Sequence, residues 1–152
     1  MTTRRGLTMT FALPDPETEP GARVARRLDA DLIAWLTLTD REGTPQPAPV
    51  WFLWDTAHAT ALIYSQPSAR RLARLESNPR CSFHLNDNGL GGDFMVFTGH
   101  LVAAPDAPPA DRNVPYAAKY GARSTEVFGS VARFASLFSI PLLFHPERIR
   151  VM

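Results

Sequence analysis

The 152-residue chain has few of the side chains that carry covalent or metal chemistry. Its single cysteine, Cys81, excludes an intramolecular disulfide and any site built from several cysteines. Because Cys81 lies in a strand-like run, we expect a buried and unreactive thiol. The four histidines lack the spacing of paired metal ligands, so no metal site is predicted. The sequence contains no nucleophile elbow, P-loop or dinucleotide-binding glycine motif.

The chain also lacks a charge excess and a long apolar run. Its 16 basic and 15 acidic side chains leave a net charge of +1, which gives no argument for nucleic acid or an anionic membrane as a partner. No apolar run reaches the roughly 18 residues that span a bilayer. The short mixed segment 7–13 is not a credible signal peptide. We therefore expect a cytoplasmic protein without nucleic-acid or membrane partners.

The length and the composition, with 45% hydrophobic and 20% charged residues, fit one soluble domain. Residues 1–20 hold four glycines or prolines and little periodic pattern. We therefore expect a flexible or loosely docked arm there, followed by a domain over residues 21–152. After Pro20, Val24 and Leu28 recur at helical spacing, which predicts a short amphipathic helix.

Strand-forming segments then alternate with turn residues. Strands are predicted over residues 32–39, 44–54, 60–65, 80–85, 94–104 and 140–151. In the second of these, prolines at 45, 47 and 49 share one face and one set of missing amide donors. Its first half therefore belongs at a sheet margin, while Val50–Trp54 is expected to be a buried strand. Gly99 marks a bulge or bend in the fifth strand.

Further helices are predicted after the third strand and near the C-terminus. Pro67 and Ser68 open a helix that ends at Asn78. Later, one helical stretch ends at Gly121 and another runs from about 124 to 138. The whole pattern predicts a mainly β (α+β) fold, in which six antiparallel strands form a closed barrel with added helices.

Two segments have the composition of a site for a flat, anionic ligand. The first supplies the hydroxyls, free amides and guanidinium groups that hold a phosphate, although an ordinary solvated helix is the alternative. Its residues are Ser65, Ser68, Arg70, Arg71 and Arg74. The second is the aromatic run 49–54 facing residues 62–64, which either walls a flat ring or serves only as core.

Two other clusters are less specific. His84 lies near Asn86, Asp87 and Asp93, a pattern that invites acid–base or metal chemistry, although a hydrogen-bonded structural histidine is favoured. An excess of apolar residues near the C-terminus fits either core or a subunit interface. These residues are Phe128, Phe134, Leu137, Phe138, Leu142, Leu143 and Phe144.

A series of short motifs follows in order along residues 22–151: Trp35–Leu38, Gly43–Pro45, Pro49–Trp54, Ile63–Pro67, Leu75-x-x-Asn78-Pro79-Arg80, His84–Asp87, Gly91–Asp93 and Tyr116-x-x-Lys119-Tyr120-Gly121. This order resembles the split-barrel flavin and deazaflavin oxidoreductases of the pyridoxamine-5′-phosphate-oxidase-like class, and within it the F-420-dependent branch. Each piece alone is weak, whereas their combination is specific.

The resemblance implies a homodimer of six-stranded split barrels with the cofactor at the subunit interface. It implies that segment 49–52 lies along the cofactor ring, and that Tyr64, Ser65 and Arg71 hold its phosphate. Together with the anion-binding pattern, the predicted cofactor-binding residues are Pro49, Val50, Trp51, Phe52, Tyr64, Ser65, Ser68, Arg70 and Arg71. Arg71 stands where many relatives carry lysine, and Leu142–Leu143 where an arginine is frequent, so a contact to the cofactor tail there is not expected.

The function implied by the resemblance is hydride transfer between reduced F-420 and a small organic substrate. An FMN-dependent oxidase or reductase of the same class is the first alternative. A carrier of flavin or tetrapyrrole without turnover is the second. No catalytic side chain is nominated, because in such enzymes the cofactor carries the chemistry.

Overall fold

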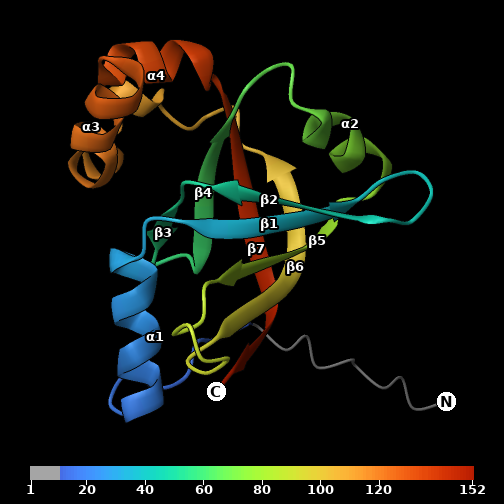
Figure 1. The fold of residues 1–152 in the computed structure, drawn as a ribbon, viewed down its shortest axis with the longest axis vertical. Coiled ribbons are helices and arrows are strands. Elements are labelled where there is room, and N and C mark those ends of the chain that lie inside the picture. Colours follow the sequence, from blue (N-terminus) through green and yellow to red (C-terminus); the bar gives the residue numbers. More distant parts are fainter. Residues whose placement is uncertain (1–10) are drawn as a thin grey trace, which may run out of the picture.

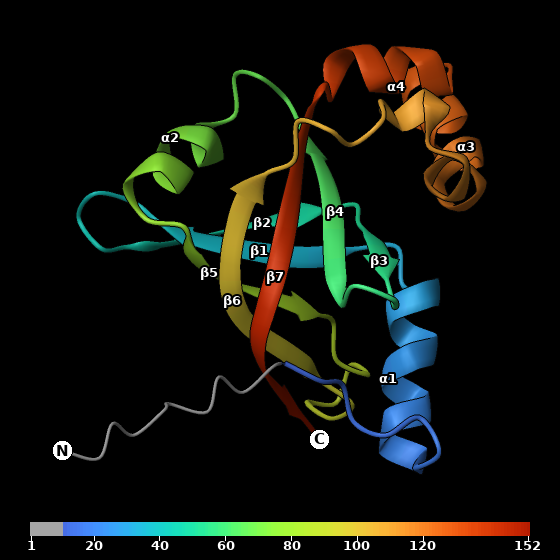
Figure 2. The same ribbon diagram turned by 180° about the vertical axis from the view of Figure 1, so that it is seen from behind.

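In the computed structural model, which describes residues 11–152, seven strands form one antiparallel sheet in the order β2-β1-β5-β6-β7-β4-β3 (Figure 1). The strands are β1 Ala34–Thr39, β2 Pro45–Val50, β3 Leu53–Asp55, β4 Thr60–Ser65, β5 Arg80–Leu85, β6 Met95–Ala103 and β7 Ile140–Val151. The helices are α1 Glu19–Ala30, α2 Arg70–Ser77, α3 Val114–Phe128 and α4 Val131–Leu137, with a 3₁₀ turn η1 at Ala110–Arg112. In the view from behind, β7 crosses the middle of the sheet between β6 and β4 (Figure 2).

The predicted count of six strands was wrong, because segment 44–54 forms two strands instead of one. β2 ends at Val50, and β3 begins at Leu53 and pairs with β4. These two strands occupy opposite edges of the sheet, yet only Trp51 and Phe52 connect them. Since three residue steps reach about 10 Å, the sheet must curl until its edges approach each other at this point. The result is a curled half-barrel with two unpaired edges, and the expected closed barrel is not formed.

The inner face of the half-barrel carries the main core. Alternating residues of β5, Cys81, Phe83 and Leu85, are buried, as their spacing predicts for a strand with one covered face. Phe83 stacks on Phe144 of β7 with ring centroids 5.2 Å apart. The predicted bulge is confirmed: the β6–β7 register shifts between Thr98 and Gly99.

Helix α1 lies beside the sheet, as its apolar spacing predicts. Val24 and Leu28 are fully buried, and the Thr18 hydroxyl caps the helix by accepting the Gly21 N–H at 3.2 Å. Ahead of it, Phe11 and Leu13 pack against the core. The predicted arm over residues 1–20 begins outside the described residues and stays a prediction.

Three predicted helix boundaries were wrong: the start of α2, the helix end at Gly121, and the start of a last helix at about 124, since that stretch is divided between α3 and α4. α2 begins at Arg70, two residues after Ser68. α3 continues through Gly121 and ends at Gly129, whose φ of 91° is the left-handed conformation that glycine adopts without strain. Ser130 then caps the separate helix α4 by accepting the Arg133 N–H. Gly121 does not end the helix, because its own conformation is helical and α3 packs on α4 there.

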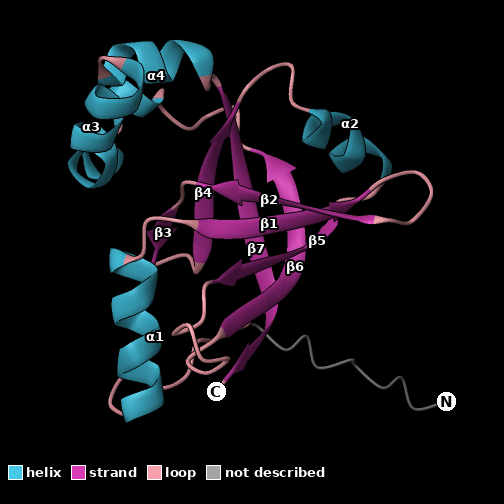
Figure 3. Ribbon diagram, viewed as in Figure 1, coloured by secondary structure: helices cyan, strands magenta, loops and turns pink. Residues whose placement is uncertain are grey.

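The helices lie at the margins of the sheet and leave the outer surface of β1 and β2 without a helical cover (Figure 3). In β1, Trp35, Thr37 and Thr39 face this side, opposite the three prolines of β2. Within residues 11–152, no helix has the length and apolarity to cross a membrane.

Candidate functional site

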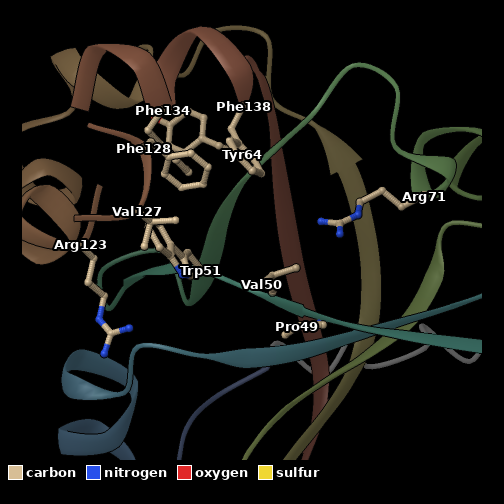
Figure 4. A pocket seen from close by; sticks show the side chains of 10 residues that line it. All are labelled: Pro49, Val50, Trp51, Tyr64, Arg71, Arg123, Val127, Phe128, Phe134 and Phe138. Carbon is tan, nitrogen blue, oxygen red and sulfur yellow. The ribbon is translucent and has the colours of Figure 1, made fainter. Parts of the chain in front are cut away.

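A cavity of about 360 Å³ lies where β2 ends, between β4, α2 and the α3–α4 pair (Figure 4). Its size is in the range of pockets that hold cofactors and other small molecules. It is lined by Pro49, Val50, Trp51, Tyr64, Arg71, Arg123, Val127, Phe128, Phe134 and Phe138. The fold therefore brings the aromatic segment and the basic helix, predicted separately as parts of a ligand site, to one place.

Trp51 forms the flat wall of this cavity. Its indole is parallel to the ring of Tyr120, at 4.8 Å and 4°, and it also stacks on Phe134 at 5.0 Å. Phe128 meets it edge-on at 6.0 Å. Because three aromatic neighbours fix the half-buried indole, the wall is rigid before any ligand binds.

Hydrogen bonds from side chains of α3 to the backbone of Phe52 explain why Trp51 lies outside the strands. The Tyr120 hydroxyl accepts the Phe52 N–H at 2.9 Å and donates either to the Leu32 carbonyl at 2.8 Å or to the Phe52 carbonyl at 3.0 Å. Lys119 donates to the same Phe52 carbonyl at 3.0 Å. These side chains replace the partners that a neighbouring strand would supply, so β2 stops and β3 starts around them. Phe52 itself is fully buried and does not line the cavity.

Two arginines approach the cavity from opposite sides, Arg71 from α2 and Arg123 from α3 (Figure 4). Neither makes an ion pair with any of residues 11–152. No acidic side chain of the described residues lines the cavity. Burial, and then the neighbouring Arg74, lower the pKa of Arg71, but a guanidinium stays charged in proteins. The cavity is therefore apolar in the middle and cationic at two ends, a combination that suits a flat ligand with anionic groups.

The remaining predicted residues lie around the cavity without sharing it. The Tyr64 ring lines it, but its hydroxyl donates to the Pro108 carbonyl at 2.5 Å and accepts from Asn113 at 3.1 Å. Burial raises the pKa of Tyr64. Ser65 is buried and donates to the Gln66 carbonyl at 3.2 Å.

Ser68 and Arg70 are exposed and lie outside the cavity. Arg70 instead borders a separate groove with Asp40 and Arg74. The predicted set is thus divided: Pro49, Val50, Trp51, Tyr64 and Arg71 line the cavity, whereas Phe52, Ser65, Ser68 and Arg70 do not. Whether any of these residues binds a cofactor stays a prediction.

Sequence reasoning missed Arg123 and Val127. Both belong to the part of α3 that follows Gly121, where a helix end was predicted. Had α3 been recognised as one helix, Arg123 would have been placed three residues after Tyr120, on the same face. Phe128, Phe134 and Phe138 were expected in core or interface, and they prove to line this cavity as well.

The polar side chains around His84 make structural contacts within the described residues instead of converging on one site. The His84 imidazole makes no hydrogen bond with the described residues and stacks on Trp35 at 6.4 Å, contrary to the expected hydrogen-bonded histidine. The Trp35 indole donates to Asn86, and Asp93 pairs with Arg23 at 2.9 Å. Over residues 11–152, no group of three or more histidine, cysteine or acidic side chains is arranged to hold a metal ion.

Comparisons with known proteins bear on the family and the fold. The sequence profile of a family described as pyridoxamine 5'-phosphate oxidase matches residues 21–140. A search of curated proteins found no matching relative.

Several solved structures share the fold at low sequence identity. A pyridoxamine 5'-phosphate oxidase candidate from Listeria innocua has a TM-score of 0.64 and 16% identity, covering 86% of this chain and 96% of its own. An F420 reductase has a TM-score of 0.62 and 18% identity, covering 82% and 94%. The heme storage protein HutZ from Vibrio cholerae has a TM-score of 0.61 and 17% identity, covering 92% and 95%. Such likeness establishes the fold alone, because relatives within it bind different groups.

Proposed function

The chain belongs to the pyridoxamine 5'-phosphate oxidase family, and on that premise we propose that it is an oxidoreductase that binds a flat, phosphate-bearing cofactor against Trp51. Reduced F-420 is the first choice and FMN the second. The observation that carries the proposal is the pairing of a preformed aromatic wall with Arg71, a guanidinium without an acidic partner among the described residues.

The residues present fit such a cofactor in chemistry and size. The Trp51 indole offers a flat face, and Arg71 offers a planar fork of donors that matches a phosphate. Arg123, on the other side, favours the more acidic F-420 over FMN.

When bound, the cofactor supplies hydride transfer to or from a small organic substrate. The chain's own part is to bind, to orient and to exclude water. The residues that line the cavity include no carboxylate, histidine or thiol that would move a proton, and the Tyr64 hydroxyl is already engaged. A heme carrier is less well supported, because among residues 11–152 no histidine, cysteine or methionine lines the cavity to ligate iron.

A second copy of the chain would complete the site. Pro49 lines the cavity and lies opposite Trp35 on the outer sheet surface that no helix covers (Figure 3). Val114 and Val127 of α3 are 79% and 60% exposed, an unusual exposure for large apolar side chains. A homodimer that packs these surfaces together would cover the open side of the cavity.

Titration of the purified protein with F-420 and with FMN, followed by tryptophan fluorescence, tests the proposal. Arg71→Ala should weaken binding by about 10- to 100-fold, since a hydrogen bond to a charged group contributes roughly 1.5–3 kcal/mol. Arg70→Ala is the matched control, because Arg70 is the exposed neighbour outside the cavity, and it should bind normally. Binding of FMN without F-420 would overturn the first choice. Failure to bind either cofactor would overturn the proposal itself.

A further inference from the structure

Lys119, the only lysine of the chain, contacts the residue next to the cavity wall instead of extending into solvent. Its ammonium lies 3.9 Å above the centroid of the Phe52 ring and donates to the Phe52 carbonyl at 3.0 Å. One residue thus receives a cation–π contact and a charge-assisted hydrogen bond from the same ammonium.

This contact matters to the cavity because the only other side-chain donor that residues 11–152 offer to that carbonyl is the Tyr120 hydroxyl, at 3.0 Å. The Tyr120 hydroxyl has one proton for two acceptors, the Leu32 carbonyl at 2.8 Å and the Phe52 carbonyl at 3.0 Å, so it cannot donate fully to both. The Phe52 ring is fully buried in the core, and Trp51, which lines the cavity, is its immediate neighbour in the chain. The Trp51 indole is stacked on Tyr120, which accepts the Phe52 N–H, while the adjacent Lys119 holds the Phe52 carbonyl, so these two residues of α3 together fix the backbone beside the indole.

We propose that Lys119 is a positioning residue for the cavity: by holding the Phe52 carbonyl and ring, its charged ammonium sets the plane of Trp51 and so controls affinity for a flat ring. The proposal rests on the proposed function only in that the cavity receives a flat ring. The identity of the cofactor does not enter it. A purely structural role would leave ring affinity independent of the charge of Lys119.

The surroundings of Lys119 bring its pKa into a range in which its charge can be titrated in the folded protein. Asp29 and Asp31, from α1 and its C-cap, favour the ammonium, although Asp31 is also paired with Arg27. Burial outweighs them and lowers the pKa of Lys119 to about 8. Tyr120 keeps its proton in this range, because burial raises its pKa.

Two opposite pH effects follow. Because the pKa of Lys119 is lower in the folded than in the unfolded chain, the folded state binds fewer protons above pH 8, and stability rises from about pH 8 towards 10. The positioning contact weakens over the same range, so affinity for a flat ring should fall. A role in folding alone predicts only the first effect.

The test uses the full chain with riboflavin, which is uncharged, and FMN as probes. Affinity of the wild-type protein for both should fall by about tenfold between pH 7 and 9.5, as a charge-assisted hydrogen bond becomes a neutral one. Lys119→Met should bind both probes weakly and without that pH dependence, while Lys119→Arg should restore tight binding at both pH values. A loss confined to FMN would overturn the proposal, because it would show simple attraction between charges. Wild-type affinity in Lys119→Met would overturn it as well.

A second measurement requires neither a ligand nor a Lys119 variant. The fluorescence of Trp51, taken as the difference between wild type and Trp51→Phe, should change with a midpoint near pH 8 in the unliganded protein. A flat profile would overturn the positioning role. If this transition is present and no flavin binds at any pH, the proposed function fails while the positioning role stands.

Discussion

Replacement of Tyr120 with phenylalanine should lower the free energy of unfolding by about 2 kcal/mol, because the fully buried hydroxyl accepts the Phe52 N–H at 2.9 Å. Without it, that N–H has no acceptor, and the Leu32 carbonyl loses its 2.8 Å donor. The Phe52 carbonyl keeps Lys119, so it adds little to the loss. A buried group left without a partner costs about 1–3 kcal/mol, and for a chain of this size about 2 kcal/mol corresponds to a fall in Tm of roughly 4–8 °C.

Tyr116→Phe is the matched control, four residues earlier on the same helix. Tyr116 is equally buried, but its hydroxyl has no hydrogen-bond partner within the described part of the chain, so its removal should be neutral or stabilising. Urea unfolding at pH 7, with the m-value required to stay constant, measures both variants. The reasoning is refuted if Tyr120→Phe stays within about 0.5 kcal/mol of wild type, or if the two variants lose equal stability.

Three further predictions concern other parts of the sheet. A Cβ at Gly99 would overlap the backbone of His145, so Gly99→Ala should lower the free energy of unfolding in urea by at least about 3 kcal/mol. Gly43 lies in open space at φ 82°, so Gly43→Ala should lower it by only about 1 kcal/mol. Equal losses of stability in the two variants would contradict this. Burial raises the pKa of Cys81 to about 12, so a thiol reagent at pH 8 should label it rapidly only after denaturation, and fast labelling of the native protein would contradict the expectation. Burial and the stacked His100 lower the pKa of His145. Stability should therefore decline as the pH falls through about 6.5, because the unfolded chain takes up the proton first. His145→Gln should flatten this decline, and an unchanged slope in that variant would count against the assignment.

Local sequence patterns predicted most strands because their boundaries have local causes. The strands over residues 60–65, 80–85 and 140–151 have the predicted bounds. Each combines strand-forming residues with turn residues or proline at its ends. The interruption at Trp51–Phe52 has no such local cause, since it is imposed by Tyr120, which lies 68 residues further along the chain than Phe52.

The candidate site was predictable only where one segment carried the signal. Trp51 and Arg71 were identified from short motifs, and the fold brings them to one cavity. Arg123 was missed because Gly121 was interpreted as a helix end, whereas the left-handed turn falls at Gly129. A glycine ends a helix only if its conformation departs from helical, and that depends on the packing of α3 against α4.

The three prolines of β2 have a consequence for how the protein behaves at high concentration. β2 is an edge strand, and its ladder with β1 must use the amides of the residues between the prolines, since proline has none. The amide positions that face outward are therefore those of Pro45, Pro47 and Pro49. A strand from another molecule would meet carbonyl oxygens there and no donors, so it could not extend the sheet. The half-barrel can thus keep this edge open beside its cavity without the risk of growing into fibrils from it.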